Sequence, residues 1–477
     1  MKVVQKHDVR SDERLDGDPA TGNPEFPFES GELDHDNNEK VQEQHFGIRA
    51  SLSAIFSWKN YRTYLITAWV FNAFEYLSTF LNLYLWEIVP SFVIIGAIWT
   101  ILSAISAVAR FFGGYVGDTV NRKTLSVVSM FLMAIYHVMI GIFIDPIFIF
   151  VALVIVSSME ITKGGSSAYI MDNIPREHSG LALSLFTAGR TLSIITLAVF
   201  AFLYPLVGFE AYRQIHLVGG IFLFGSTIAR AIFLESNPQK KRVAGSKLLK
   251  CFIEDNNRAI KILLKILPGM MAVCFLDAIS DSFFKFGALI YINSTLLIDI
   301  QSIAIMMIAT LIIQVPLLLK LGRLSDRKGV KSTALVVYTF MPVSAALLIL
   351  AYWVPDWAPI SVIEGANLLL PGLGVIFKVS FLAVVLKYVN DQLWFVIMLI
   401  LIRKRLPSQD TSKILSMFWF VIYLASSIGP FIGGLISEFT NILFLFVGVL
   451  ILNIIILGTI ARYDLISKST IDQKETS

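Results

Sequence analysis

Apolar stretches of about 20 residues recur along this chain from Tyr61 onward, and they restrict its fold more than any other feature. A helix of that length crosses the ~30 Å hydrocarbon core of a bilayer, where every backbone polar group needs a partner within the chain. We therefore predict an all-α polytopic membrane protein with about twelve transmembrane helices. The predicted spans are 61–86, 91–114, 124–144, 147–170, 181–205, 215–234, 266–292, 301–320, 332–354, 378–402, 413–436 and 441–462.

The composition agrees with a membrane protein and excludes several other classes. Hydrophobic residues make up 56% of the chain and charged residues 16%, the reverse of the balance in soluble proteins. A net charge of +4 in short, separate clusters does not indicate a nucleic-acid partner. Cys251 and Cys274 lack the spacing of a metal site or a disulfide framework, and His137, His178 and His216 are isolated in the sequence. Without a nucleotide-binding loop or a dinucleotide fingerprint, we expect no enzymatic activity, no metal and no cofactor.

The charges of the loops predict the orientation of the chain. Basic residues concentrate in alternate loops, at Arg122, Lys123, Arg176, Lys240, Lys241, Arg242, Lys247, Lys250, Arg323, Arg327, Lys328, Lys331, Arg403, Lys404 and Arg405. The opposite loops contribute little beyond Arg213. By the positive-inside rule the basic side is cytoplasmic, which places both termini inside, as an even number of spans requires. We assign the protein to the plasma membrane.

Composition also divides the chain into five parts. Residues 1–47 form an acidic tail with few aliphatic residues, which we expect to be disordered and cytoplasmic. A six-helix half at 48–234, a basic cytoplasmic linker at 235–265, a second six-helix half at 266–462 and a cytoplasmic tail at 463–477 follow.

Two further apolar segments are not assigned as spans. Residues 46–58 have apolar side chains at helical spacing and suit a short helix on the inner membrane surface. Residues 357–377 are long enough to be read as a crossing, but a crossing there would place Arg403, Lys404 and Arg405 outside. We therefore interpret Pro359 to Gly374 as an external or re-entrant insertion.

A short motif follows the second predicted span and is repeated after the eighth. The copies read GYVGDTVNRK at 114–123 and GRLSDRKGVK at 322–331. Both resemble the loop signature of the major facilitator superfamily, G-x-x-x-D-R-x-G-R-K. The second copy keeps Gly322, Asp326, Arg327, Gly329 and Lys331. The first keeps Gly114, Asp118, Arg122 and Lys123, with Thr119 and Asn121 in place of the usual Arg and Gly.

The resemblance implies a transporter built from two pseudo-symmetric six-helix halves. A carboxylate beside basic residues can stabilise a helix N-terminus in one conformation and release it in another, so the motif implies a gating loop. A single copy would fit a solvated turn equally well. At Asn121 we expect a left-handed backbone, which Asn tolerates better than other residues that have a side chain. The glycine-rich run at 429–434 also resembles family helix motifs, whereas the fifth span lacks the proline motif of drug antiporters.

Ionisable groups within the spans are the candidates for substrate chemistry, because charge in lipid is expensive unless it faces a cavity or a partner. Asp277, Asp281 and Lys285 repeat every four residues, so they share one helix face, which must look inward. Because the first and seventh spans are equivalent under the repeat, Glu75 and the two aspartates are expected to flank a central cavity. The candidates for solute or proton binding are Glu75, Asp277, Asp281, Asn72, Arg190, Glu160 and Asp391.

These residues lead to a functional hypothesis with open alternatives. A desolvated carboxylate near another can exchange a proton in the working pH range, so one of the three acidic groups is expected to couple transport to a proton or another ion. Alternatively, Asp281 with Lys285, and Glu160 with Lys163 or Arg190, are fixed ion pairs that hold helices together. We expect a monomeric secondary transporter in the bilayer that moves a small organic solute by alternating access. An uncoupled facilitator and a non-transporting receptor or scaffold remain alternatives.

Overall fold

A computed structural model describes residues 48–163, 166, 169, 185, 186, 188–236, 248–328, 330–405 and 411–463. Within these ranges the regular structure is helical, apart from one isolated bridge between Asp356 and Lys378. Eight of the described helices are long and apolar enough to cross a membrane, or nine if the bent pair α11 and α12 is one span. The predicted all-α polytopic class is therefore confirmed.

The described part of each predicted span coincides with helical structure. Before the linker these are α2 (Lys59–Glu75) with η1 (Tyr76–Phe80) and α3 (Leu81–Ile88), α4 (Phe92–Thr119), α5 (Arg122–Ile142), α6 (Pro146–Ser158), η3 (Gly189–Leu192) with α9 (Ser193–Val207), and α10 (Glu210–Phe233). After it come α12 (Pro268–Ser294), α13 (Ile300–Lys328), α14 (Val330–Tyr338) with α15 (Phe340–Leu350), α17 (Val379–Arg405), α18 (Thr411–Phe439) and α19 (Ile442–Arg462). The other helices with bounds inside the described ranges are α1 (Ile48–Ser57), α11 (Leu248–Ile266), α16 (Ile360–Leu369) and η5 (Leu373–Phe377).

Short polar side chains begin several of these helices where the apolar runs were predicted to start. The side chains of Ser91, Asn121, Asp145 and Asn441 accept hydrogen bonds from backbone N–H groups in the first turns of α4, α5, α6 and α19. Each cap satisfies a donor that the helix itself cannot pair. At Asn121 the backbone has φ −55°, so the predicted left-handed conformation is wrong. The residue serves as an N-cap, with its Oδ1 2.9 Å from the N of Lys123.

The first predicted span is not a single regular helix. Its α-helical geometry ends at Glu75, and the turn of 3₁₀-helix at Tyr76–Phe80 precedes a second α-helix. The Ser78 hydroxyl donates to the carbonyl of Glu75 over 2.6 Å in this turn. A 3₁₀ segment within a helix marks a position where the helix bends or unwinds, and here it lies directly beside a candidate carboxylate.

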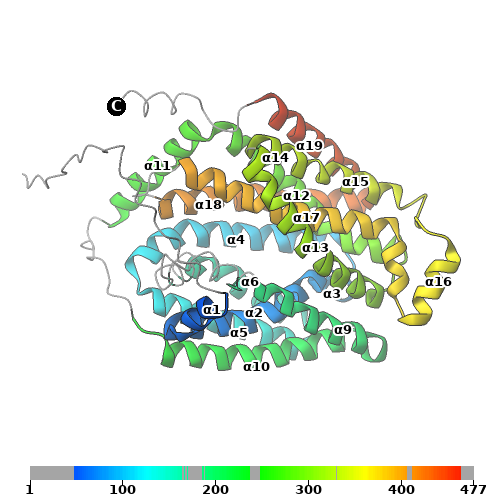
Figure 1. Cartoon of the computed structure of the whole chain (residues 1–477), viewed down its shortest axis with the longest axis horizontal. Helices are drawn as coiled ribbons and strands as arrows, with labels where there is room; N and C mark the ends of the chain where they lie inside the picture. Colours follow the sequence, from blue (N-terminus) through cyan, green and yellow to red (C-terminus); the bar gives the residue numbers. More distant parts are fainter. Residues whose placement is uncertain are drawn as a thin grey trace, which may run out of the picture. The chain divides into compact units, whose positions relative to one another are not determined.

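Helices α4 and α18, which come from either side of the linker, lie side by side along much of their length (Figure 1). Glycines allow this approach. A Cβ on Gly434 would lie 2.5 Å from the carbonyl oxygen of Phe92, and a Cβ on Gly114 would lie 2.8 Å from Oγ of Ser416. Between these points the Thr100 hydroxyl donates to the carbonyl of Ser427 over 2.8 Å. Small residues of the 429–434 run thus permit close helix packing, as predicted.

The apolar stretch at 357–377 does not form a span. It holds α16, which at ten residues is too short to cross a bilayer, followed by η5. Its two ends are joined by the Asp356–Lys378 ion pair, with 2.7 Å between Oδ1 and Nζ. Gly372 adopts φ +86°, a conformation that favours glycine. The prediction of an insertion here is confirmed, and α16 projects beyond α15 and α17 in Figure 1.

Candidate functional site

Four charged side chains meet between α12 and α17. Lys387, only 1% exposed, donates to Asp281 over 2.5 Å and also pairs with Asp391. Lys285 donates to the other oxygen of Asp281 over 2.7 Å and lies 3.7 Å from Asp391. Two carboxylates and two ammonium groups thus form a network without net charge, which reduces the cost of burying them. The predicted face of Asp277, Asp281 and Lys285 does point into the protein, although Lys285 itself keeps a 61% exposed side chain.

Glu75 and Arg190 form a second pair of opposite charges, with 3.9 Å between Oε2 and Nε. Arg190 also donates to the Oε1 of Gln392 on α17 over 2.9 Å, which connects η3 to a helix beyond the linker. Both charged side chains are partly exposed. Tyr76 lies within electrostatic range of this pair as well as of Lys285 and Asp391, so the two groups of charges are neighbours. The expected placement of Glu75 across a central cavity from Asp277 and Asp281 stays a prediction.

Asp277 has different surroundings from the other carboxylates. Its Oδ1 lies 2.7 Å from the hydroxyl of Tyr338, which also lies 2.9 Å from Oδ1 of the buried Asn453. Among the described residues no lysine or arginine lies within ion-pair distance of Asp277. This carboxyl group therefore has a neutral hydrogen-bonding partner, whereas Asp281, one helical turn away, has two cationic partners.

Glu160 is the centre of a third cluster, away from Arg190. It pairs with Lys163 and lies 3.7 Å from Arg110 on α4, so the predicted alternative with Lys163 is confirmed and the pairing with Arg190 is not found. Arg110 was not among the predicted site residues, although a lone arginine inside an apolar run was a usable signal. Asn72 is buried where α2 meets α9, and its backbone carbonyl accepts a hydrogen bond from Ser193.

The gating-loop residues are only partly described. Gly114 lies in α4 against Ser416, and Arg122 begins α5. Asp118, Gly322, Asp326 and Arg327 belong to helical backbone, but their side chains lie outside the described ones, and Gly329 lies outside the described residues. The gating role of the motif therefore stays a prediction.

His137 and His216, which are isolated in the sequence, meet in the structure. Their rings stack between α5 and α10 with centroids 4.6 Å apart, beside Tyr136 and Tyr212. Their sequence positions are 79 residues apart, so only helix packing brings them together. In the described part of the chain no three histidine, cysteine or acidic residues form a group that could hold a metal ion.

Two comparisons with known proteins identify the family and the fold. The family model of the Major Facilitator Superfamily matches residues 50–393, which is most of the chain. The chain therefore belongs to the major facilitator superfamily and is an integral membrane transporter. A search of curated protein sequences finds no match.

Solved structures show the same fold at low sequence identity. The D-xylose-proton symporter is 12% identical with a TM-score of 0.60, covering 86% of this chain and 98% of its own. The nucleoside transporter NupG is 14% identical with a TM-score of 0.57, covering 85% and 99%. The human organic anion transporter TETRAN is 11% identical with a TM-score of 0.55, covering 86% and 99%. At these identities the likeness shows the fold alone.

Proposed function

We propose that the chain is a secondary active transporter that moves a small organic solute by alternating access, with transport coupled to a proton carried by Asp277. The observation that supports this proposal is the difference between the carboxylates. Glu75, Asp281, Glu160 and Asp391 each have a cationic partner, whereas Asp277 has a tyrosine hydroxyl. A carboxylate held by a cation stays ionised, while one held by a neutral group in a low-dielectric region can change its protonation state.

The hydrogen bonds around Asp277 suit both protonation states. The single hydroxyl proton of Tyr338 can go to Asp277 or to Asn453, but not to both. If Asp277 is protonated, it donates to Tyr338, which in turn donates to Asn453. If it is ionised, Tyr338 donates to it, and the Asn453 amide, whose Nδ2 is buried without a partner, can turn to donate to the tyrosine. Changes in hydrogen bonding can therefore accommodate both protonation states of Asp277.

The solute is proposed to contact the partly exposed charges near Tyr76. Glu75, Arg190, Lys285 and Asp391 offer both signs of charge in one neighbourhood. Such a set can bind a polar organic solute through charge-assisted hydrogen bonds. The D-xylose-proton symporter shows by its name that this fold accommodates proton coupling.

The test is solute flux in proteoliposomes with an imposed pH gradient. Pooled metabolites and lipophilic cations are screened with the native protein, then with Asp277→Asn. The expected result is gradient-driven accumulation that Asp277→Asn abolishes, while counterflow exchange of the same solute persists. The matched control is Asp145→Asn, because asparagine also caps a helix and this residue caps α6 far from the site in sequence.

The alternative functions give different results in this assay. An uncoupled facilitator would move solute down its own gradient regardless of pH, and Asp277→Asn would then transport normally. A receptor or scaffold would bind solute without exchange. Glu75→Gln, with exposed Glu210→Gln as its control, tests the solute contact separately through the apparent affinity.

We propose in addition that the chain acts as a monomer in the plasma membrane, with both termini cytoplasmic and with two six-helix halves at 48–234 and 266–462. The basic loops support this orientation. Terminal reporter fusions test the topology, and light scattering of the purified protein tests the monomer. Charge reversal at Asp326 tests the gating loop, because a latch variant should change transport rate without changing the folded fraction.

A further inference from the structure

Helix α11 runs across the direction of the span that follows it. The axes of 252–265 and 268–294 differ by 100°, with Leu267 between the helices and Pro268 at the start of α12. Phe252 near the start of α11 packs on Phe111 and Phe112 of α4, with ring centroids 4.8 and 5.5 Å apart. The helix is therefore held at the end of the bundle where α4 leads into α5.

Three faces of α11 have different surroundings. One face packs on the protein through Ala259 and Leu263, which are buried. A second face is apolar and exposed, since Ile253 is 58% and Leu264 55% exposed. These two residues are eleven positions apart, close to three full turns, so they lie on the same side of the helix.

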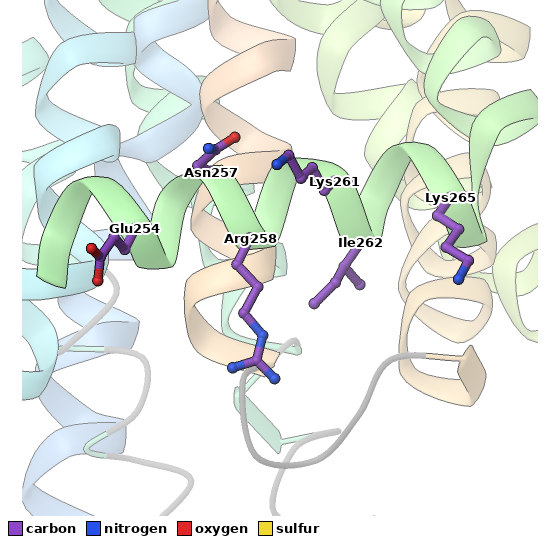
Figure 2. A pocket seen from close by; sticks show the side chains of 6 residues that line it. All are labelled: Glu254, Asn257, Arg258, Lys261, Ile262 and Lys265. Carbon is purple, nitrogen blue, oxygen red and sulfur yellow. The ribbon is translucent and has the colours of Figure 1, made fainter.

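The third face is cationic. Arg258, Lys261 and Lys265, with Glu254 and Asn257, line a groove of about 380 Å³ along the helix (Figure 2). Arg258 and Glu254 have further interactions of their own, and Lys261 and Lys265 add two more positive charges to this face. Figure 2 shows the side chains of Lys261 and Lys265 one turn apart on this face and pointing in different directions, so they can reach separate anionic groups.

We propose that α11 is an interfacial helix that binds the headgroups of anionic phospholipids in the leaflet at that end of the bundle. A helix lying across the spans can bury one apolar face at the boundary between acyl chains and headgroups, which would cover Ile253 and Leu264. The cationic face then lies at headgroup level, where each Lys or Arg near an anionic surface contributes about 1 kcal/mol. Because α11 belongs to the segment that joins the two groups of six predicted spans, lipid bound to it would contact the connection between them.

The first experiment measures lipid retention by the full-length protein in nanodiscs that contain phosphatidylcholine and a minor share of phosphatidylserine. Lys261→Gln combined with Lys265→Gln is expected to lower phosphatidylserine retention roughly thirtyfold, with less effect at high salt. Lys261→Arg with Lys265→Arg should keep it. The matched control is Lys59→Gln with Arg62→Gln, which removes two exposed cations from the start of α2.

Equal retention by the α11 glutamine variant and the native protein would overturn the proposal. So would complete displacement of phosphatidylserine by millimolar inorganic phosphate, because the groove would then be a site for soluble anions. All variants are compared only if they elute as one species and melt within a degree or two of the native protein.

The second experiment locates the helix independently of lipid charge. Nitroxide labels are placed at Ile253→Cys, Leu264→Cys and Lys261→Cys in a background with Cys251→Ser and Cys274→Ala. The proposal requires that oxygen collides with the labels at the first two positions more readily than a water-soluble nickel complex does, and that the label at 261 shows the opposite order. Water-like collision rates at all three positions would refute the interfacial placement.

Discussion

Removing the buried ammonium group of Lys387 should destabilise the protein far more than removing an exposed lysine. Lys387→Met keeps most of the volume and apolar length of the side chain, so the change is mainly electrostatic. The variant loses charge-assisted contacts with Asp281 and Asp391 and leaves the network with a net charge of −1. Lys285 remains close to Asp281, at 2.7 Å, but lies 3.7 Å from Asp391. Asp391 is therefore the group left without an adequate partner.

The size of the effect follows from this geometry. Breaking a buried ion pair by removing one partner costs about 3–5 kcal/mol. The two carboxylates keep side-chain exposures of 27% and 23%, so water offsets part of the loss and we expect the lower end, about 3 kcal/mol. That value corresponds to a roughly hundredfold change in the ratio of folded to unfolded protein. The double variant Lys387→Met with Asp391→Asn restores neutrality and keeps the Asp281–Lys285 pair, so it should recover about half of the loss or more.

The assay is unfolding in mixed micelles with increasing dodecyl sulfate, followed by tryptophan fluorescence. Lys59→Met serves as the matched control, because Lys59 and its partner Glu235 are 54% and 66% exposed and 3.7 Å apart. Such a surface pair contributes at most about 1 kcal/mol. The reasoning fails if Lys387→Met is as stable as Lys59→Met, or if the double variant is no more stable than Lys387→Met alone.

Two further substitutions test the helix contacts. Gly434→Val should cost about 1–3 kcal/mol and slow transport, because its side chain would meet the backbone of Phe92; native stability in a thermal melt would contradict the close α4–α18 contact. Asn121→Ala should lower the free energy of unfolding by about 1 kcal/mol, because α5 loses the capping hydrogen bond from the backbone N–H of Lys123. Asn121→Ser should cost little, because serine also caps helices. Stabilisation by Asn121→Gly in the same melt would instead favour the left-handed backbone that the motif suggested.

The spans could be predicted because their determinant is local. A run of about 20 apolar residues has few stable alternatives to a membrane helix, and the described part of each predicted span is helical. The unwinding at Tyr76–Phe80 was not predicted, because that segment is as apolar as its flanks and its geometry depends on neighbouring helices. The reason at Asn121 is different, because a local capping hydrogen bond to Lys123 rather than the turn of the motif determines its backbone.

The candidate site was predictable to the extent that its contacts are local. The spacing of Asp281 and Lys285 predicts their ion pair directly, because residues four apart share a helix face. Lys387 lies 106 positions after Asp281, and its contact depends on how α12 and α17 pack. Tyr338 and Asn453 likewise reach Asp277 from distant helices. A sequence shows which groups are charged, but packing decides which of them are neutralised.

Contacts within one proposed half and contacts between the two halves should respond differently to the proposed rocking motion. The Lys387 network and the Asp277–Tyr338 bond join helices that all follow the linker, so a rigid movement of one half against the other would leave both intact. The Arg190–Gln392 bond joins η3 to α17, so it would break if the proposed motion moved these two elements apart. Breaking it leaves Arg190 with Glu75 alone, on the same side of the linker. A solute that bridges Arg190 and α17 would replace the lost bond in one conformation only, and a ligand shifts an equilibrium to the extent that it binds one state better. Coupling through Asp277 would then require that its access to water differs between the two conformations, because its hydrogen bonds are the same in both.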